Sequence, residues 1–143
     1  MKTNHGFTLI ELLVALALFL AIGVSATTFS AKSVGEHAVA DTENFLVGSL
    51  REARWESRLG KGTDSWGVHV GGNRITLFQG ASYESRDGSS DQVYEYNRNV
   101  SVSGPDEIVF SRVEGSPSVT GTFVISWRGS ERRLTVNGLG VVE

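Results

Sequence analysis

Glu11 is the residue of this chain whose surroundings point most directly to chemistry. It stands inside the stretch GFTLIELLVALALFLAIGV, residues 6–24, which is otherwise almost entirely apolar. A charged side chain within a membrane span costs roughly 2.5–3.5 kcal/mol on insertion scales, so such groups usually face protein or water and have a function. Glu11 could instead lie at the level of the lipid headgroups and gain only from the positive N-terminus of a helix. Its position alone does not choose between these two interpretations.

Groups that could support catalysis are scattered along the chain. The histidines are His5 near the start, His37 in a helical pattern and His69 in a strand pattern, and no serine or carboxylate stands with them in a recognised arrangement. The chain has no cysteine, which excludes disulfides, thiolate nucleophiles and cysteine zinc sites. The segment GGN at residues 71–73 lacks the phosphate-loop pattern and is typical of a turn. We therefore expect no enzyme, no catalytic residue and no cofactor.

Oxygen-bearing side chains gather in the polar segment GASYESRDGSSDQ, residues 80–92. Glu84, Asp87 and Asp91 are ligands of the type that calcium takes, but the segment lacks the spaced acidic ladder and the closing glutamate of an EF-hand. An ordinary solvated loop is the favoured interpretation. We predict no metal site.

Basic side chains gather near the C-terminal end of the chain. Arg128, Arg132 and Arg133 flank a predicted turn and could contact phosphate at one end of a sheet. The alternative is an exposed hairpin whose charges give solubility and protect a sheet edge. The formal net charge of −3 supplies no overall basic field that would attract nucleic acid. DNA contact through these arginines is therefore the less favoured of the two interpretations.

A long helical pattern would position Glu11. The apolar run from Phe7 through about Ala26 is roughly 20 residues long, which as a helix spans about 30 Å of hydrocarbon. Removal of a secretory signal by cleavage near Ser25, Ala26 or Ala31 is the alternative. Helix-like sequence continues past these residues without a break. We therefore predict an anchor that is retained in the mature protein.

The pattern becomes amphipathic beyond the apolar run. Between Lys32 and Leu59 the larger apolar side chains recur at helical spacing with charged residues between them, which predicts a helix with one buried face. These apolar positions are Val39, Leu46, Leu50 and Ala53, with Phe45 beside them. Gly60 is expected to end the helix, because glycine accepts the left-handed conformation of a C-cap. Glycines at 23, 35 and 48 weaken the helix, and whether it melts between Gly23 and Phe29 is left open.

From Thr63 onward, alternation of apolar and polar residues predicts strands. The runs SWGVHV and RITLFQG are joined by GGN, which predicts a hairpin because these residues accept positive φ. Further strands are predicted at Val93–Tyr96, Val100–Ser103 and Ile108–Ser111, and a second hairpin turns at Gly129. We expect one antiparallel sheet whose apolar face covers the helix.

The segment GFTLIELLVAL resembles the leader-peptidase site of type IV pilins and type II secretion pseudopilins. The resemblance implies cleavage after Gly6 by a prepilin peptidase and N-methylation of the new terminal Phe7. The apolar helix would stay in the inner membrane, with the C-terminal domain outside the cytoplasm. The resemblance also implies that Glu11 is tied to the free amine of Phe7 and to assembly. The expected partners are other pilins or pseudopilins and an inner-membrane assembly platform.

The second half of the chain resembles the GspH/FimT group of minor pseudopilins and minor pilins, through its WGV strand with a hairpin and its C-terminal GLGVVE. The expected fold is α+β and pilin-like. It comprises a cleaved leader at 1–6, a transmembrane helix at 7–28, an amphipathic continuation at 29–60 and an antiparallel β domain at 61–143. We expect a membrane-anchored structural subunit of a pilus or a secretion pseudopilus. The alternative is a signal-anchored, β-rich exported domain that binds a ligand such as DNA outside a filament.

Overall fold

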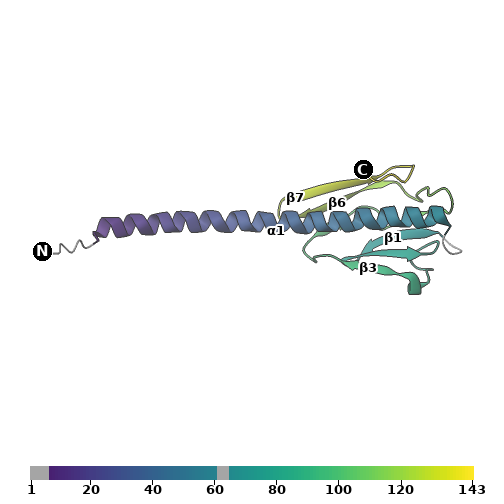
Figure 1. Cartoon of the computed structure of the whole chain (residues 1–143), viewed down its shortest axis with the longest axis horizontal. Helices are drawn as coiled ribbons and strands as arrows, with labels where there is room; N and C mark the ends of the chain where they lie inside the picture. The colour runs from purple at the N-terminus through teal and green to yellow at the C-terminus, as the bar shows by residue number, and fades with distance from the viewer. Residues whose placement is uncertain (1–6, 61–64) are drawn as a thin grey trace.

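The computed structural model describes residues 7–60 and 65–143, without the side chains of residues 23–32. A long helix is followed by strands and a short 3-10 helix: α1 (Leu9–Leu59), β1 (Trp66–Gly71), β2 (Arg74–Gln79), η1 (Gly88–Ser90), β3 (Gln92–Glu95), β4 (Ser101–Ser103), β5 (Glu107–Phe110), β6 (Gly121–Trp127) and β7 (Ser130–Val136). Figure 1 shows the N-terminal half of α1 projecting beyond the strands, which lie against its C-terminal half. This is the α+β arrangement that the sequence predicts. The predicted leader, residues 1–6, lies outside the described residues.

Helix α1 begins and ends at residues whose types favour those positions. Thr8 is the N-cap, and Gly60 is the C-cap in the left-handed region with a φ of 65°. The Gly60 N–H donates to the carbonyls of Glu56 and Ser57, so the predicted glycine C-cap is confirmed. The backbone is helical throughout, also between Gly23 and Phe29. The 51 residues of α1 form one rod about 75 Å long.

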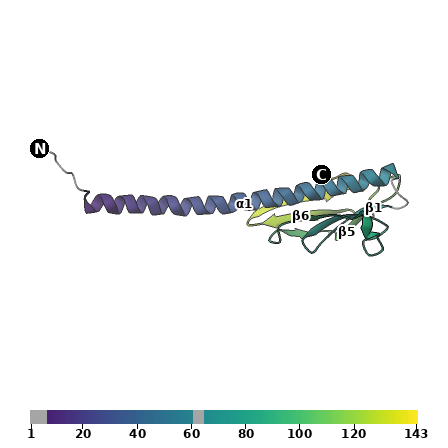
Figure 2. The same cartoon turned by 60° about the horizontal axis from the view of Figure 1, so that its bottom comes forward.

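The strands form two antiparallel sheets, so the prediction of one sheet is wrong. The first sheet has the order β3-β2-β1-β5 and the second the order β4-β6-β7, and α1 lies across both (Figure 2). The chain first leaves the first sheet for the second between β3 and β4, in a turn where the Val100 N–H donates to the Asn97 carbonyl at 2.8 Å, and it returns to the first sheet for β5 before β6 and β7 complete the second. Alternation marks a strand but does not identify its neighbours, which is why the sequence did not predict this division.

The predicted strands and hairpins are confirmed, with bounds shifted by at most one residue at β1 to β5. Strands β1 and β2 pair in antiparallel register through a turn at Gly72 and Asn73. Both turn residues have positive φ, 60° and 62°, which is the geometry that matches the twist of a two-residue hairpin. Glycine and asparagine are therefore required here by the backbone.

The hydrophobic core lies between α1 and both sheets. The predicted helix positions Val39, Leu46, Leu50 and Ala53 are all fully buried. They pack against apolar residues of both sheets: Val68, Ile75, Leu77, Ile108, Phe110, Phe123, Ile125, Leu134 and Val136. Phe45 is 44% exposed. The amphipathic half of α1 is the element that joins the two sheets into one core.

Ser57 fixes the C-terminal end of α1 to the first sheet. Its buried hydroxyl donates to the carbonyl of Phe110 in β5 at 3.1 Å and accepts from the N–H of Trp66 in β1 at 3.0 Å. Ser49, about two turns earlier on the helix, is also buried, but its hydroxyl has no hydrogen-bond partner among the described residues. Of these two buried serines of α1, Ser57 forms hydrogen bonds through its hydroxyl and Ser49 does not.

Candidate functional site

The first turn of α1 holds the Glu11 carboxylate in a capping box. The backbone N–H of Thr8 donates to Glu11 Oε2 at 3.0 Å, and the Thr8 hydroxyl donates to the same oxygen at 2.9 Å. In return, the Glu11 N–H donates to Thr8 Oγ1 at 3.3 Å. This reciprocal pair satisfies backbone donors that the N-terminus of a helix leaves without partners. The signal in the sequence is a threonine three residues before a glutamate, which was not predicted as a capping box.

The carboxylate therefore lies at the positive end of the helix, directly beside Phe7. Phe7 precedes the N-cap and is 89% exposed. Both donors from Thr8 reach Oε2, so Glu11 Oε1 is left as an acceptor for a further donor. A carboxylate held in this way can bind a cation or an N–H group that approaches the helix end.

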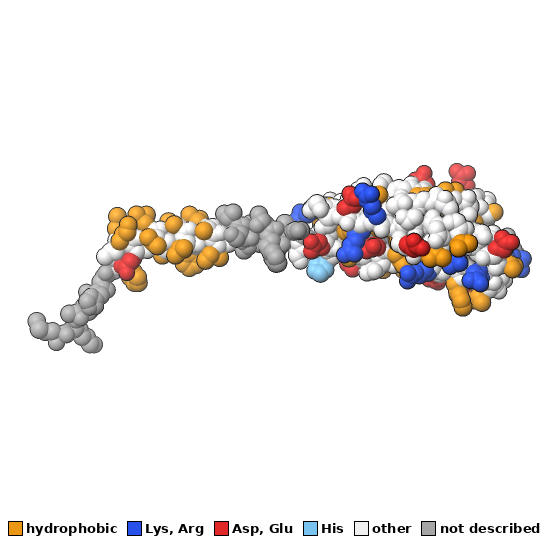
Figure 3. Space-filling view, turned by 90° about the horizontal axis from the view of Figure 1, so that it is seen from above, with side chains coloured by type: hydrophobic (Ala, Val, Ile, Leu, Met, Phe, Trp, Pro, Cys, Tyr) orange, Lys and Arg blue, Asp and Glu red, His pale blue; other side chains and the backbone are white. Residues whose placement is uncertain are grey.

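The surface around Glu11 is apolar on every side of the helix. The large apolar side chains of residues 7–22 are each between 52% and 89% exposed: Phe7, Leu9, Ile10, Leu12, Leu13, Val14, Leu16, Leu18, Phe19, Leu20 and Ile22. Figure 3 shows this part of α1 covered by apolar side chains (orange), with acidic atoms (red) at its N-terminal end. A helix that is apolar all round is normally buried in protein or lipid. The apolar side chains of this half of α1 are therefore expected to be buried in lipid or in another protein, because the β domain does not bury them.

A shallow groove follows one side of this surface. Its volume is about 350 Å³, and it is lined by Phe7, Ile10, Glu11, Val14, Ala15 and Leu18. The Glu11 carboxylate thus lies among the apolar side chains of this shallow groove. A second helix laid in this groove would bring its own groups close to Glu11.

Within the part of the chain whose side chains the structure describes, no helix combines the length and the apolar character needed to cross a membrane. The predicted transmembrane span at 7–28 includes residues 23–28, whose side chains lie outside that part. The predicted cleavage position, Gly6, also lies outside the described residues. Both stay predictions.

The three arginines considered for phosphate contact do not form one cluster. Arg132 and Arg133 are neighbours on β7, so their side chains point to opposite faces of the sheet. Arg132 pairs with Glu43 of α1 at 3.3 Å, and Arg133 pairs with Glu131 at 2.9 Å. Arg128 lies over the indole ring of the residue before it, 4.9 Å from the ring centroid. DNA contact here stays a prediction, and two of its three residues already have carboxylate partners.

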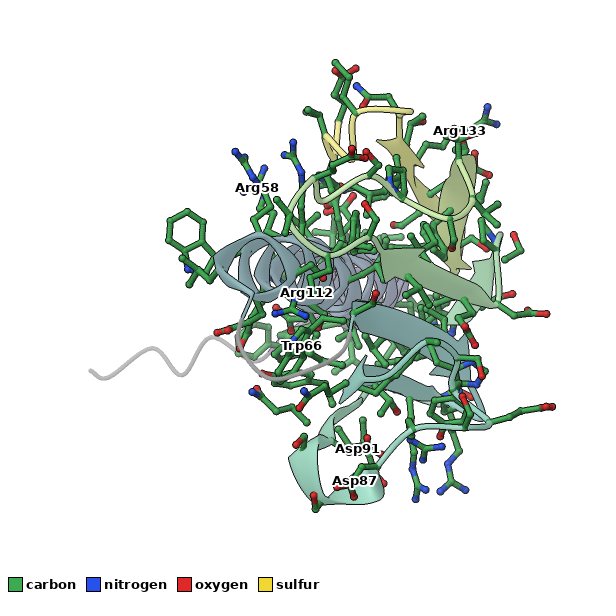
Figure 4. All side chains as sticks on the ribbon, turned by 90° about the vertical axis from the view of Figure 1, so that its right-hand side faces the viewer. Arg58, Trp66, Asp87, Asp91, Arg112 and Arg133 are labelled. Atoms are coloured by element: carbon green, nitrogen blue, oxygen red, sulfur yellow. The ribbon has the colours of Figure 1, made fainter. Side chains whose placement is uncertain are left out.

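The acidic loop uses its carboxylates for its own structure. Arg86 Nε donates to Asp91 Oδ2 at 2.8 Å, and Asp87 caps η1 by accepting from the N–H of Ser89 at 3.0 Å. The bond from Ser89 lowers the pKa of the Asp87 carboxyl. Figure 4 shows Asp87 and Asp91 close together in this loop, at the outer edge of the first sheet. Within residues 7–60 and 65–143 no group of three or more histidine or acidic side chains is arranged to hold a metal ion.

The two described histidines have unrelated environments. His37 is exposed on α1. His69 of β1 stacks on the ring of Tyr83 with centroids 3.8 Å apart, and Arg86 lies over the same ring at 3.6 Å. This stack of three side chains holds the loop at 80–91 against the first sheet. We interpret this stack as a contact that stabilises the fold.

The fold and the site together define a class of protein. The helix has a capping box at its start, its first half is apolar and uncovered, and its second half is buried against two antiparallel sheets. This is an α+β arrangement consistent with a pilin-like architecture. The prokaryotic N-terminal methylation motif, the signature of type IV pilins and pseudopilins, matches residues 1–27 of this chain. The motif indicates a membrane-anchored protein with a processed N-terminus. Comparison with curated proteins gave no match, and comparison with solved structures gave none.

Proposed function

We propose that this chain is a membrane-anchored structural subunit, a minor pilin or pseudopilin of the GspH/FimT type, in a type IV pilus or a type II secretion pseudopilus. A prepilin peptidase cleaves it after Gly6, and the new N-terminus at Phe7 is N-methylated. The subunit then assembles with other pilins or pseudopilins through the N-terminal half of α1, on an assembly platform in the inner membrane. The β domain lies outside the cytoplasm, and the role of the chain is structural, not catalytic.

The uncovered apolar half of α1 is the observation that supports this proposal most strongly. Burying a side chain of the size of leucine or phenylalanine gains roughly 1.5–3 kcal/mol, and residues 7–22 present such side chains on every side of the helix. A lipid bilayer would cover this surface before assembly, and helices of neighbouring subunits would cover it afterwards. The same helix continues without a break into the core through Val39 and Leu46, so one element joins the apolar half to the β domain.

Glu11 would set the position of one subunit against the next. Cleavage after Gly6 turns the peptide nitrogen of Phe7 into an α-amino cation, directly before the N-cap Thr8 whose N–H and hydroxyl bind the Glu11 carboxylate. Opposite charges attract far more strongly in a dry environment than in water. The carboxylate would therefore neutralise its own amine or the amine of a neighbouring subunit. The bonds from Thr8 hold it at the helix end in both cases.

Mass spectrometry of the mature protein tests the proposal. We expect an N-methylated Phe7 at the N-terminus, and recovery of the protein in sheared filaments or in crosslinks to other pilins. A mature N-terminus near Ala26 or Ala31 would contradict the proposal, because cleavage there removes the apolar half of α1. A methylated chain that never enters assemblies and binds DNA as a monomer would favour the exported binding domain instead.

A further inference from the structure

Arginine and tryptophan side chains form a face at the C-terminal end of α1 that the proposed function does not use. Arg51, Arg54, Trp55 and Arg58 follow one another at intervals of three, four and seven residues from the first, which places them on one side of the helix. Arg51 and Arg58 are exposed, and Trp55 is 61% exposed. Figure 3 shows basic side chains (blue) beside apolar ones (orange) at this end of the molecule.

The C-terminal segment of the chain completes a hollow beside this face. The hollow has a volume of about 270 Å³ and is lined by Arg51, Arg54, Trp55, Arg58, Gly140, Val141 and Val142. We call it the arginine hollow. Its walls combine guanidinium groups with apolar atoms of the indole and the valines. Such a lining suits a ligand that carries both negative charge and an apolar group.

Two glycines allow the loops to approach the arginine stems closely. A Cβ at Gly140 would lie 3.1 Å from Arg54 Nε, and a Cβ at Gly115 would lie 2.7 Å from the Cγ of Arg58. Both glycines have positive φ, 71° and 69°. The loops therefore hold the stems of Arg54 and Arg58 in place, and the direction of the guanidinium groups is restricted before any ligand arrives.

The charges of the arginine hollow are not compensated within the described chain. None of the carboxylates in residues 7–60 and 65–143 pairs with Arg51, Arg54 or Arg58, whereas Arg74 and Arg86 each pair with an acidic residue. Arg54 Nε is buried and has no hydrogen-bond partner there. A buried donor without a partner destabilises the folded state, because it has lost its hydrogen bonds to water. A ligand that supplies an acceptor would remove this cost.

We propose that the arginine hollow binds an acidic segment of a partner protein. Carboxylates of the segment accept from the guanidinium groups of Arg51, Arg54 and Arg58, and an apolar side chain of the segment packs on Trp55 and Val141. Tryptophan and arginine are the residue types that most often carry the affinity of protein interfaces. Charge-assisted bonds to arginine add direction, because the guanidinium donors have a fixed planar geometry.

A protein segment fits the hollow better than a nucleic acid does. A nucleic acid strand needs a basic track that follows its phosphates over several nucleotides, whereas the arginine hollow is short, concave and partly apolar. In Figure 4 Arg58 and Arg133 lie on different sides of the molecule, so the two arginine groups do not join into such a track. The hollow also lies at the end of α1 opposite to the apolar half, and it stays accessible when that half is covered.

Binding to the full chain in detergent micelles tests this inference without any filament. The probe is a fluorescent peptide that alternates leucine with glutamate, and its binding is followed by anisotropy. We expect saturable binding that disappears when glutamine replaces glutamate in the peptide. The double variant Arg51→Gln/Arg58→Gln should bind the peptide at least about tenfold more weakly, because it removes two of the three guanidinium groups that make charge-assisted bonds in the hollow. Trp55→Ala should weaken binding several-fold.

The matched control is Arg128→Gln/Arg133→Gln, which removes the same charge from exposed arginines elsewhere and should leave the affinity unchanged. Thermal melting of each variant checks the fold. The inference fails if the peptide does not bind, or if both double variants lose affinity equally, because the attraction would then be to net charge alone. It also fails if a single-stranded oligonucleotide of equal charge binds more tightly than the peptide through Arg51 and Arg58, which would make the hollow a nucleic-acid site.

Discussion

Replacing Glu11 by glutamine separates two roles of this side chain, capping the helix and carrying a charge. The capping box consists of the bonds from Thr8 to Glu11 Oε2 at 3.0 and 2.9 Å and the return bond at 3.3 Å. Glutamine keeps a carbonyl oxygen at the same place, so Glu11→Gln should retain the cap. It removes the negative charge, and with it the partner of the Phe7 amine. Thr8→Val is the matched control, because it removes the capping hydroxyl and keeps the charge.

The expected effects of the two losses differ enough to be told apart. Losing an N-cap costs about 0.5–2 kcal/mol, whereas leaving one member of a buried ion pair without its partner costs about 3–5 kcal/mol. At about 1.4 kcal/mol for each factor of ten, Thr8→Val should lower the assembly equilibrium by at most about thirtyfold. Glu11→Gln and Glu11→Leu should each lower it by more than about a hundredfold. Glu11→Asp should recover part of this loss, since it keeps the charge with a shorter reach.

The assay compares the variants in the membrane and in assemblies. Each is expressed beside the wild type, equal membrane levels and N-terminal processing are confirmed, and the fraction recovered in sheared filaments is measured. The pairing argument is refuted if Glu11→Gln is recovered like the wild type while Thr8→Val and Glu11→Leu are both lost. In that outcome Glu11 serves the helix cap, and its charge has no part in assembly.

Three further predictions concern processing, packing and pH. Gly6→Val should leave uncleaved precursor in the membrane, because the resemblance implies a peptidase that accepts a residue without a side chain beside the cleaved bond; normal maturation on a gel would show that the cleavage site is wrong. Ser57→Ala should lower the free energy of unfolding by about 1–3 kcal/mol through loss of its buried hydrogen bonds, while Ser49→Ala, at a buried hydroxyl without a partner, should be close to neutral in the same denaturant titration. The bonds from Ser89 lower the pKa of the Asp87 carboxyl, so the ionised carboxylate stabilises the folded loop above the pKa of the unfolded chain, and this contribution is lost as pH falls through the folded value. The protection factor of the Ser89 amide, which is its exchange rate corrected for the intrinsic pH dependence, should therefore fall on acidification in the wild type and show no such step in Asp87→Asn.

The elements of this fold were predictable where a local pattern determines them. Helical spacing identified the buried positions Val39, Leu46, Leu50 and Ala53, and the turn residues Gly72 and Asn73 identified the first hairpin. The division into two sheets was not predictable, because it depends on β5 returning to β1 and on β4 pairing with β6. These pairings join segments that are distant in the sequence, and alternation within a strand carries no information about them.

For the candidate sites too, closeness in the sequence did not predict which side chains lie together. Arg128, Arg132 and Arg133 are close in the sequence, but the alternation of side chains along β7 separates the last two. Arg51, Arg54 and Arg58 are more widely spaced and yet share one face, because helical spacing brings them together. Attention to the charged residues of the helix, and not only to its apolar ones, would have found this second group from the sequence.

The continuity of α1 has a mechanical consequence. A pull on residues 9–22 acts along the axis of the helix, and the buried side chains Val39, Leu46, Leu50 and Ala53 lie at successive points along that axis. A closely packed interior transmits such a strain with little compression. A pull along the helix therefore loads all the contacts between α1 and the two sheets at the same time, in shear. A force that peels one sheet sideways from the helix would break its contacts one row at a time, so the subunit should resist tension along α1 far better than tension across it.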